Sequence, residues 1–411
     1  MSYTIAGIDI HKKVLMVVVT EVAVEELRFV CRRFGTTASE REHVVAWLQE
    51  HQVQEVVMES TAQYWKPVWL DLEPHFGRLH LAQAHSNRAP KGRKNDFGDS
   101  KRLVRRLIAG ELILSFVPDA EQRSWRTMAR GKLQLVRDRV RLENQLEALL
   151  EEMRIKLSSV VSQLLGLSGR RILRALAEGE TDPDKLAQWG DRRLKCSKEE
   201  LQDALRGQWQ AMHRQMLQLF LERLDLLDRQ IEQLDRMMAE AMKDHESAVI
   251  RLAEVPGFGP NSAQQMIAEV GPDVKTFPSA GEFASWIGCC PGSQESAEEN
   301  HSSRSPKGNP FVRRVLTQAA QAAIKKKGSH FQAVFRHWRP TLGYNGALWA
   351  VALKLCRVIW KILHDRVQYI ERGQESSPKA KKQRAQKMIN ALRKLGYNVV
   401  ITSPLPQSAQ A

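Results

Sequence analysis

The feature that most constrains this fold is a change in hydrophobic period near residue 120 of the 411-residue chain. Before that point, short apolar runs alternate with stretches of helical spacing, whereas after it Leu, Arg, Gln and Glu dominate and strand patterns vanish. We predict strands at 4–10, 14–20, 26–33, 55–59 and 79–82, and helices at 39–51, 64–72 and 99–109. Residues 1–115 are therefore expected to form an α/β domain, with helical regions after it.

The second region, 120–245, carries two apolar stripes at helical spacing. The first stripe is Leu142, Leu146, Leu149, Met153 and Leu157, and the second is Leu224, Leu227, Ile231, Leu234 and Met238. Residues at such intervals share one helix face. We predict two long helices that pair as a coiled-coil hairpin or across a dimer, and an ordinary bundle within one chain fits the same spacing.

The third region, 246–373, is expected to be a mainly α domain. Inside it, the turn Val-Pro-Gly-Phe-Gly precedes an apolar helix, which predicts a helix-hairpin-helix. In such a motif Gly257 and Gly259 would let helix N-termini approach a DNA phosphate, although the same turn also serves as a plain connector. Residues 374–411 are polar and strongly basic, which predicts a tail that binds nucleic acid.

The composition favours a nucleic-acid partner. The formal net charge is +15, from 62 Lys and Arg against 47 Asp and Glu. Such a surplus gives affinity for phosphate backbones by releasing counterions. No run is long and apolar enough to cross a bilayer, which excludes a membrane protein. The five cysteines show no CxxC spacing, which argues against a zinc site or a disulfide framework and favours a reducing cytoplasm.

Four carboxylates of the first domain point to a metal site. Asp9 lies inside an apolar strand and Glu59 ends another, where a carboxylate is costly unless it is paired, exposed or bound to metal. Asp96 and Asp99 are three residues apart, so that on a helix they share a face. Hard oxygen ligands favour Mg²⁺, or Mn²⁺. This order of acids is the layout of ribonuclease-H-like nucleases, although each acid alone also fits a cap or an ion pair.

Basic residues flank the acidic pair and could track a phosphate backbone beside the metal. They are Arg88, Lys91, Arg93, Lys94, Lys101 and Arg102. A solvated helix face is the alternative interpretation.

A second candidate site is the serine loop, residues 288–310, in which small, polar and basic residues lead into a helix. A helix N-terminus with Arg304, Lys307, Arg313 and Arg314 nearby could hold a phosphate. A serine there could attack phosphorus and form a phosphoserine link. The residues alone leave the choice of serine open, and a mobile polar loop fits the spacing as well.

Taken together, these segments resemble the DEDD transposases of the insertion-sequence "one-ten" family, the bridge-RNA-guided recombinases. The segments are GIDIHKK (7–13), MES (58–60), NDFGDS (95–100), WIGCCPGSQESA (286–297) and KGNP (307–310). The likeness covers the chain to about residue 373. Two features depart from the family. Glu298, Glu299 and Asn300 follow the Ser-Ala pair, where many relatives have Gly-Lys-Arg, and the basic extension has no firm counterpart.

The resemblance implies a ribonuclease-H-like, resolvase-like first domain whose tetrad is Asp9, Glu59, Asp96 and Asp99. It implies that Ser296 is the nucleophile of the C-terminal transposase domain and takes the DNA strand as a phosphoserine, while Mg²⁺ at the tetrad of another subunit assists. It further implies donor and target DNA as substrates, a structured bridge RNA that selects both, and dimers that assemble into a tetramer. The expected location is the cytoplasm of a bacterium or archaeon, at the nucleoid.

Two other function classes compete with the serine recombinase. One is a metal-dependent nuclease or Holliday-junction resolvase that uses water, in which Ser296 is only structural. The other is a non-catalytic nucleic-acid-binding derivative of the fold. The presence of all four acids and the serine counts against the last class.

Overall fold

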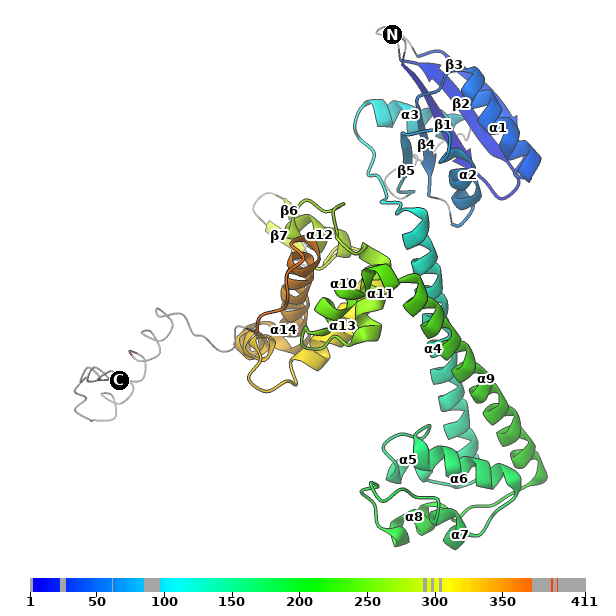
Figure 1. The fold of residues 1–411 in the computed structure, drawn as a ribbon, viewed down its shortest axis with the longest axis vertical. Helices are drawn as coiled ribbons and strands as arrows, with labels where there is room; N and C mark the ends of the chain where they lie inside the picture. Colours follow the sequence, from blue (N-terminus) through cyan, green and yellow to red (C-terminus); the bar gives the residue numbers. More distant parts are fainter. Residues whose placement is uncertain are drawn as a thin grey trace. The chain divides into compact units, whose positions relative to one another are not determined.

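The computed structural model describes residues 3–22, 27–60, 62–84, 97–290, 294–296, 299–302 and 305–371, with Gln386 and Asn390. For 294–296 and 299–302 it describes the backbone alone. The chain divides into two compact units, Met1–Asp119 and Ala120–Ala411, which are called the N-terminal and C-terminal units below (Figure 1). The predicted basic tail lies outside the described residues, apart from Gln386 and Asn390.

The N-terminal unit is built on a five-stranded mixed sheet in the order β3-β2-β1-β4-β5. The strands are β1 (Thr4–Ile10), β2 (Leu15–Glu21), β3 (Phe29–Phe34), β4 (Glu55–Glu59) and β5 (Leu79–Ala82). β1 pairs antiparallel with β2 and parallel with β4. The apolar runs therefore form strands at the predicted places. β1, β2, β4 and β5 bury residues on both faces, whereas β3 is largely exposed and buries Phe34.

Helices cover both faces of this sheet, as alternate strand residues show. Ile8 and its neighbours on one face pack with α1 (Ala38–Glu50) and α2 (Trp65–Leu72). Ile5 and Val57, on the other face, pack with Leu103 of α3 (Gly98–Ile108). This helix–sheet–helix arrangement covers the central strands on both faces, and it places α3 against β1 and its neighbours β2 and β4 (Figure 1).

The C-terminal unit is mainly helical over the part that the structure describes. Its elements are α4 (Ala120–Glu152), α5 (Leu157–Val160), α6 (Leu167–Glu178), α7 (Pro183–Ala187), α8 (Lys198–Ala204), α9 (Ala211–Ala241), η1 (Lys243–His245), α10 (Glu246–Ala253), α11 (Pro260–Val270), α12 (Ala280–Ile287), β6 (Gln294–Ser296), β7 (Glu299–Ser302), α13 (Pro310–Ala323) and α14 (His330–His364). One apolar core lies among α4, α6 and α9, and a second joins α10 to α14.

Both predicted stripes pack within this one chain, with Ile231 and Leu234 of the second stripe only partly buried. α4 and α9 lie side by side, and Asp228 on α9 pairs with Arg139 on α4 at 3.3 Å (Figure 1). The first stripe does not belong to a single helix: α4 ends at Glu152, and Arg154 turns the chain with a positive φ of 61° before Leu157 opens α5. Helical spacing continued across this break because both segments bury their apolar side chains in the same core.

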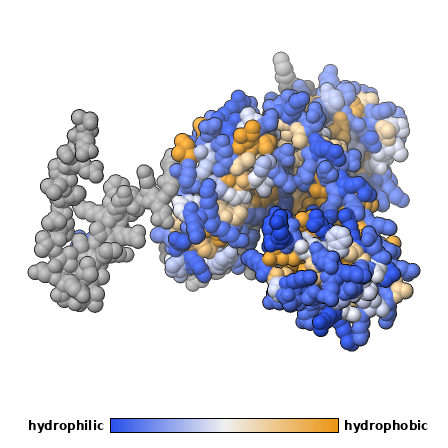
Figure 2. Space-filling view, turned by 60° about the horizontal axis from the view of Figure 1, so that its bottom comes forward, coloured by the Kyte–Doolittle hydropathy of each residue, from blue (hydrophilic) through white to orange (hydrophobic). Residues whose placement is uncertain are grey.

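None of the described helices combines the length and the apolar character that crossing a bilayer requires. On the face drawn in Figure 2, hydrophilic residues cover most of the described surface and apolar residues form small patches.

Candidate functional site

The acidic site begins with two neighbouring strand ends. β1 and β4 run parallel with Ile8 opposite Met58, so the next residues, Asp9 and Glu59, lie side by side at the same edge of the sheet. Asp9 is buried, with 7% of its surface exposed. Backbone pairing alone therefore brings together two acids that are 50 positions apart in the sequence.

The start of α3 brings a third acid to this edge. The Asp9 amide N–H donates to Ser100 Oγ over 3.2 Å, and Ser100 Oγ donates to the Met16 carbonyl over 2.7 Å. A side chain at Gly7 would lie 2.5 Å from the Ser100 carbonyl oxygen, so only glycine lets α3 approach β1 this closely. Asp99, next to Ser100, is thereby held near Asp9.

The electrostatics show that these carboxylates interact. Burial raises the pKa of Asp9 above its ordinary value, and the charges of Asp99 and Glu59 raise it further. His11 opposes the rise, because its Nε2 lies 3.1 Å from Asp9 Oδ2. Asp99 forms an ion pair with Arg102 on the next turn of α3. The nearby negative charges thus disfavour the ionised form of the buried Asp9 carboxyl.

The carboxylates are ligands of the kind that a divalent cation prefers, although their side chains do not form a complete coordination site. Among the described residues, no three Asp, Glu, His or Cys side chains are placed to hold a metal ion. Asp96, the fourth predicted ligand, lies outside the described residues. Like charges around a buried carboxylate are what a hard cation relieves, and Asp9, Glu59 and Asp99 offer only oxygen ligands.

The flanking basic residues fall into two groups. Arg88, Lys91, Arg93 and Lys94 lie outside the described residues. Arg102 is engaged with Asp99, and the Lys101 ammonium lies 5.6 Å from the centre of the Phe29 ring. Lys101 therefore packs its charge over β3, while Arg102 serves the acidic cluster.

The predicted serine lies in a short β-hairpin. β6 and β7 pair antiparallel, with Ser296 opposite Glu299 and Gln294 opposite Ser302. The sequence predicts a polar loop here and not a hairpin, because these residues show no apolar alternation. Arg304 lies outside the described residues, and the side chain of Ser296 is not described.

At the base of the serine loop, the two ends of the loop come into close backbone contact at two glycines. Gly288 has a φ of +76°, and a side chain there would lie 2.5 Å from the Pro306 carbonyl oxygen. A side chain at Gly308 would lie 2.0 Å from the Ile287 carbonyl oxygen. The two ends of the loop thus meet backbone to backbone, which fixes where the hairpin starts and returns.

Side chains from two helices hold this base in place. Arg313 on α13 donates to the Gly288 carbonyl and, over 3.1 Å, to the Pro306 carbonyl. Its guanidinium lies 4.5 Å from the centre of the Trp349 ring on α14, and Trp349 Nε1 donates to Ser305 Oγ over 2.9 Å. Arg313, a predicted phosphate ligand, is thus occupied by the loop itself, whereas Lys307 is exposed.

The last predicted arginine, Arg314, faces α11. It donates to Gln265 and, over 2.9 Å, to Gln318. Burial lowers its pKa, and the nearby charge of Arg137 on α4 adds to this. Arg314 therefore contributes to a half-buried positive surface between these helices.

The predicted helix-hairpin-helix corresponds to α10, a turn and α11. Gly257 has a φ of +89°, and a side chain there would lie 2.1 Å from the Ala319 carbonyl oxygen of α13. Gly257 thus serves close packing within the unit. Gly259, directly before α11, has open space where a side chain would lie, so it is the position that a ligand could approach.

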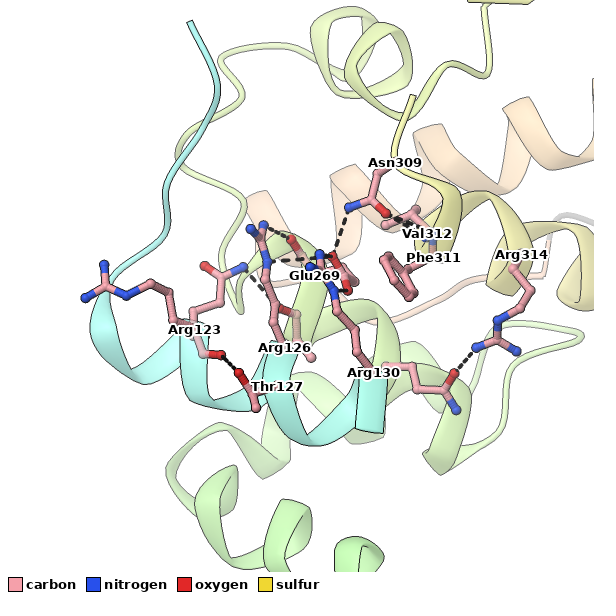
Figure 3. Close-up of polar contacts among 12 residues, drawn as sticks. Arg123, Arg126, Thr127, Arg130, Glu269, Asn309, Phe311, Val312 and Arg314 are labelled. Atoms are coloured by element: carbon pink, nitrogen blue, oxygen red, sulfur yellow. Dashed lines mark hydrogen bonds and ion pairs between the residues drawn. The ribbon is translucent and has the colours of Figure 1, made fainter. Parts of the chain in front are cut away.

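Sequence reasoning missed one functional candidate, Glu269. It lies in the apolar end of α11 with 2% of its surface exposed, and its side chain pairs with Arg130 of α4 and Asn309 (Figure 3). The signal was available, because Glu269 interrupts an apolar run in the same way as Asp9.

Two transposase family models match the segments of the chain that contain the two candidate sites. A family model for DEDD transposases of IS110, described as "Transposase", matches residues 6–155, which include the four acids. A model described as "Transposase IS116/IS110/IS902 family" matches residues 250–336, which include Ser296.

The chain is also similar to two curated proteins. A "Probable family 20 transposase" of Pseudomonas aeruginosa is 27% identical over 318 residues, which are 75% of this chain and 83% of that protein. The "Insertion element IS900 uncharacterized 42 kDa protein" of Mycobacterium paratuberculosis is 27% identical over 146 residues, 35% of this chain and 36% of that protein.

Proposed function

This chain belongs to the IS110 family of transposases, as its motifs predict, and on that premise we propose that it cuts and rejoins DNA through a phosphoserine link at Ser296. The family makes it an enzyme that acts on DNA. Asp9, Glu59, Asp96 and Asp99 would hold a divalent cation, and Ser296 would attack the phosphodiester.

The observation that carries this proposal is the convergence of three carboxylates at one edge of a ribonuclease-H-like sheet. Parallel pairing places Asp9 beside Glu59, and α3 adds Asp99. When bound there, Mg²⁺ or Mn²⁺ supplies Lewis-acid stabilisation of charge on phosphoryl oxygens. The buried backbone around Asp9 holds the ligands in place. His11 contacts Asp9, and Arg102 pairs with Asp99.

The serine step is a transesterification. The Oγ–P bond forms, the bond from phosphorus to a deoxyribose oxygen breaks, and the released hydroxyl gains the proton that the serine loses. The energy of the phosphodiester is kept in the phosphoserine, so the reverse attack by another strand end rejoins DNA without a cofactor. The anchored loop base supports this role, because a nucleophile must be held within reach of its target.

The remaining partners follow the family resemblance. A structured bridge RNA would select donor and target DNA, and dimers would assemble into a tetramer. The net charge of +15 supports binding to either nucleic acid. Exposed Lys307 and the accessible Gly259 turn are proposed phosphate contacts, as are the basic residues before and within α3 and the polar face near Arg314.

The test is a denaturing gel of end-labelled DNA incubated with the protein, its guide RNA and Mg²⁺. The account expects a covalent protein–DNA adduct with the intact chain and none with Ser296→Ala. Free cut ends from Ser296→Ala would instead establish the water-using nuclease. Binding without breakage by the intact chain would establish the non-catalytic derivative.

A further inference from the structure

The buried acid Glu269 has no role in the chemistry proposed so far. It lies near the end of α11, between Ala268 and Val270, which are themselves buried. An ionised carboxylate in such surroundings is costly unless charges and hydrogen bonds compensate it. Its partners therefore indicate what it is retained for.

Two of its partners come from α4. Arg130 binds both carboxylate oxygens, with Nε to Oε1 and Nη2 to Oε2 each at 2.8 Å. Arg126 lies one turn earlier, with its Nε 3.6 Å from Oε2, and donates to the Glu269 carbonyl (Figure 3). A two-point arginine bond fixes direction as well as distance, so the carboxylate cannot rotate freely.

The third partner starts the helix after the serine loop. Asn309 Nδ2 donates to Glu269 Oε2 over 2.9 Å. The other end of the same amide, Oδ1, accepts from the Phe311 and Val312 amides over 2.9 and 3.3 Å and so caps α13. The Arg130 guanidinium lies 4.3 Å from the centre of the Phe311 ring.

These contacts join the loop base to α4. Asn309 directly follows Gly308, whose backbone closes the loop against Ile287. A shift of Asn309 would therefore move one end of the loop that carries Ser296. Arg126 and Arg130 lie in the first turns of α4, which begins at Ala120, the residue after the N-terminal unit.

We propose that Glu269 is a positioning residue for the serine nucleophile: held by Arg130, it fixes Asn309 and thereby the returning end of the serine loop. This inference rests on the proposed function. It predicts that disturbing the Glu269–Asn309 bond slows the covalent step more than it weakens binding of DNA or folding. If Glu269 were only structural, disturbing this bond would lower the stability of the fold and would not slow the covalent step selectively.

The sharpest test exchanges the charge of the pair. Asn309→Asp keeps a good helix cap but turns a carboxylate toward that of Glu269, and Glu269→Gln removes the charge that Arg130 holds. In the double variant Glu269→Gln/Asn309→Asp, the glutamine amide can donate to the new carboxylate, and the cluster regains the one negative charge that Glu269→Gln removes. We expect the adduct rate at saturating DNA to fall at least about tenfold in Asn309→Asp and to recover severalfold in the double variant.

The matched control is Asp228→Asn. Asp228 also pairs with two arginines, Arg139 at 3.3 Å and Arg170 at 2.6 Å, in the same unit but away from the serine loop. The full-length chain is used throughout, with DNA affinity and melting temperature measured for every variant. Asp228→Asn is expected to lower the melting temperature while its adduct rate at saturating DNA stays within about twofold of the unmodified chain.

Two results would overturn the proposal. One is a double variant no faster than the slower single variant, which would show that the pair is not coupled. The other is an adduct rate that falls only in proportion to lost stability, equally in Glu269→Gln and Asp228→Asn. An adduct formed by Ser296→Ala would refute the proposed nucleophile instead. The comparison of the single and double variants measures the coupling between Glu269 and Asn309 whichever residue attacks the DNA.

Discussion

The two candidate sites of this chain are built by different means. In the N-terminal unit, backbone hydrogen bonds of a parallel strand pair place Asp9 beside Glu59. In the C-terminal unit, the base of the serine loop is placed by side chains such as Arg313 and by close contacts at Gly288 and Gly308.

The difference predicts where each site is vulnerable. When a site is positioned by a sheet, loss of one carboxylate leaves the fold intact, because the strands stay paired, but it removes activity. A loop set by side chains and glycines loses its geometry when one anchor changes. Substitutions in the first site should therefore separate activity from stability, and substitutions in the second should affect both.

The largest effect is expected for Asp9→Asn. Without this carboxylate the proposed cation site lacks a buried ligand, so DNA cleavage in Mg²⁺ should fall by at least about 10³-fold. The melting temperature should not fall. The matched control is Asp71→Asn in the same unit, whose carboxylate pairs with Arg41 instead, and which should cleave at the normal rate. Cleavage by Asp9→Asn at a similar rate to the control would remove Asp9 from the site.

The second effect tests the backbone contact between the two ends of the serine loop. Gly308→Ala forces a side chain against the Ile287 carbonyl and should destabilise the C-terminal unit by about 1–3 kcal/mol, with loss of adduct formation. Gly281→Ala is the control, because its nearest neighbour would be Ser279 Oγ at an ordinary 3.7 Å. Urea unfolding of both variants measures the difference. Equal stability of the two would show that the loop ends are not in contact.

The third effect is a pH dependence at Asp9. Because burial and neighbouring charges raise its folded-state pKa, ionised Asp9 destabilises the metal-free fold above that pKa. Asp9→Asn should therefore melt about 2 °C or more above the unmodified chain at pH 7 without Mg²⁺. The advantage should shrink as pH falls toward the ordinary value of 3.8, and thermal scans across pH measure it. A constant or reversed difference contradicts the assigned cause.

The smallest effect contrasts two basic residues of the serine loop region. Lys307 is exposed, so Lys307→Gln should reduce the slope of log affinity against log salt by about one and leave stability unchanged. Arg313 is bound to two carbonyls, so Arg313→Gln should lower stability and leave that slope nearly unchanged. Titrations of labelled DNA at several salt concentrations, with melting curves, measure both. The opposite assignment of the two effects would contradict the described anchoring of Arg313.

The same contrast explains what the sequence could predict. The strands around Asp9 and Glu59 follow from alternation and apolar runs, and a parallel register then places both acids without further information. The backbone contact at Gly308 could not be predicted, because it depends on the Ile287 carbonyl, 21 positions earlier in the chain. Glu269 shows an intermediate case: its position in an apolar helix was visible, but its partners Arg130 and Asn309 come from distant segments.

The break at Arg154 shows a limit of helical spacing. Residues of the first stripe enter one core whether or not a single helix carries them, so periodicity alone could not locate the end of α4. The hairpin of β6 and β7 shows the reverse case, since pairing occurs there without an apolar pattern.

The central claim is that the carboxylate-bound cation and Ser296 act on the same phosphodiester. The most direct measurement uses DNA with one sulfur in place of a non-bridging oxygen at the scissile phosphate, because Mg²⁺ binds sulfur poorly and Mn²⁺ tolerates it better. The account predicts that adduct formation with one sulfur isomer is slow in Mg²⁺ and is restored by Mn²⁺. Equal adduct formation in both metals with both isomers, or an undiminished adduct in Asp9→Asn, would contradict it.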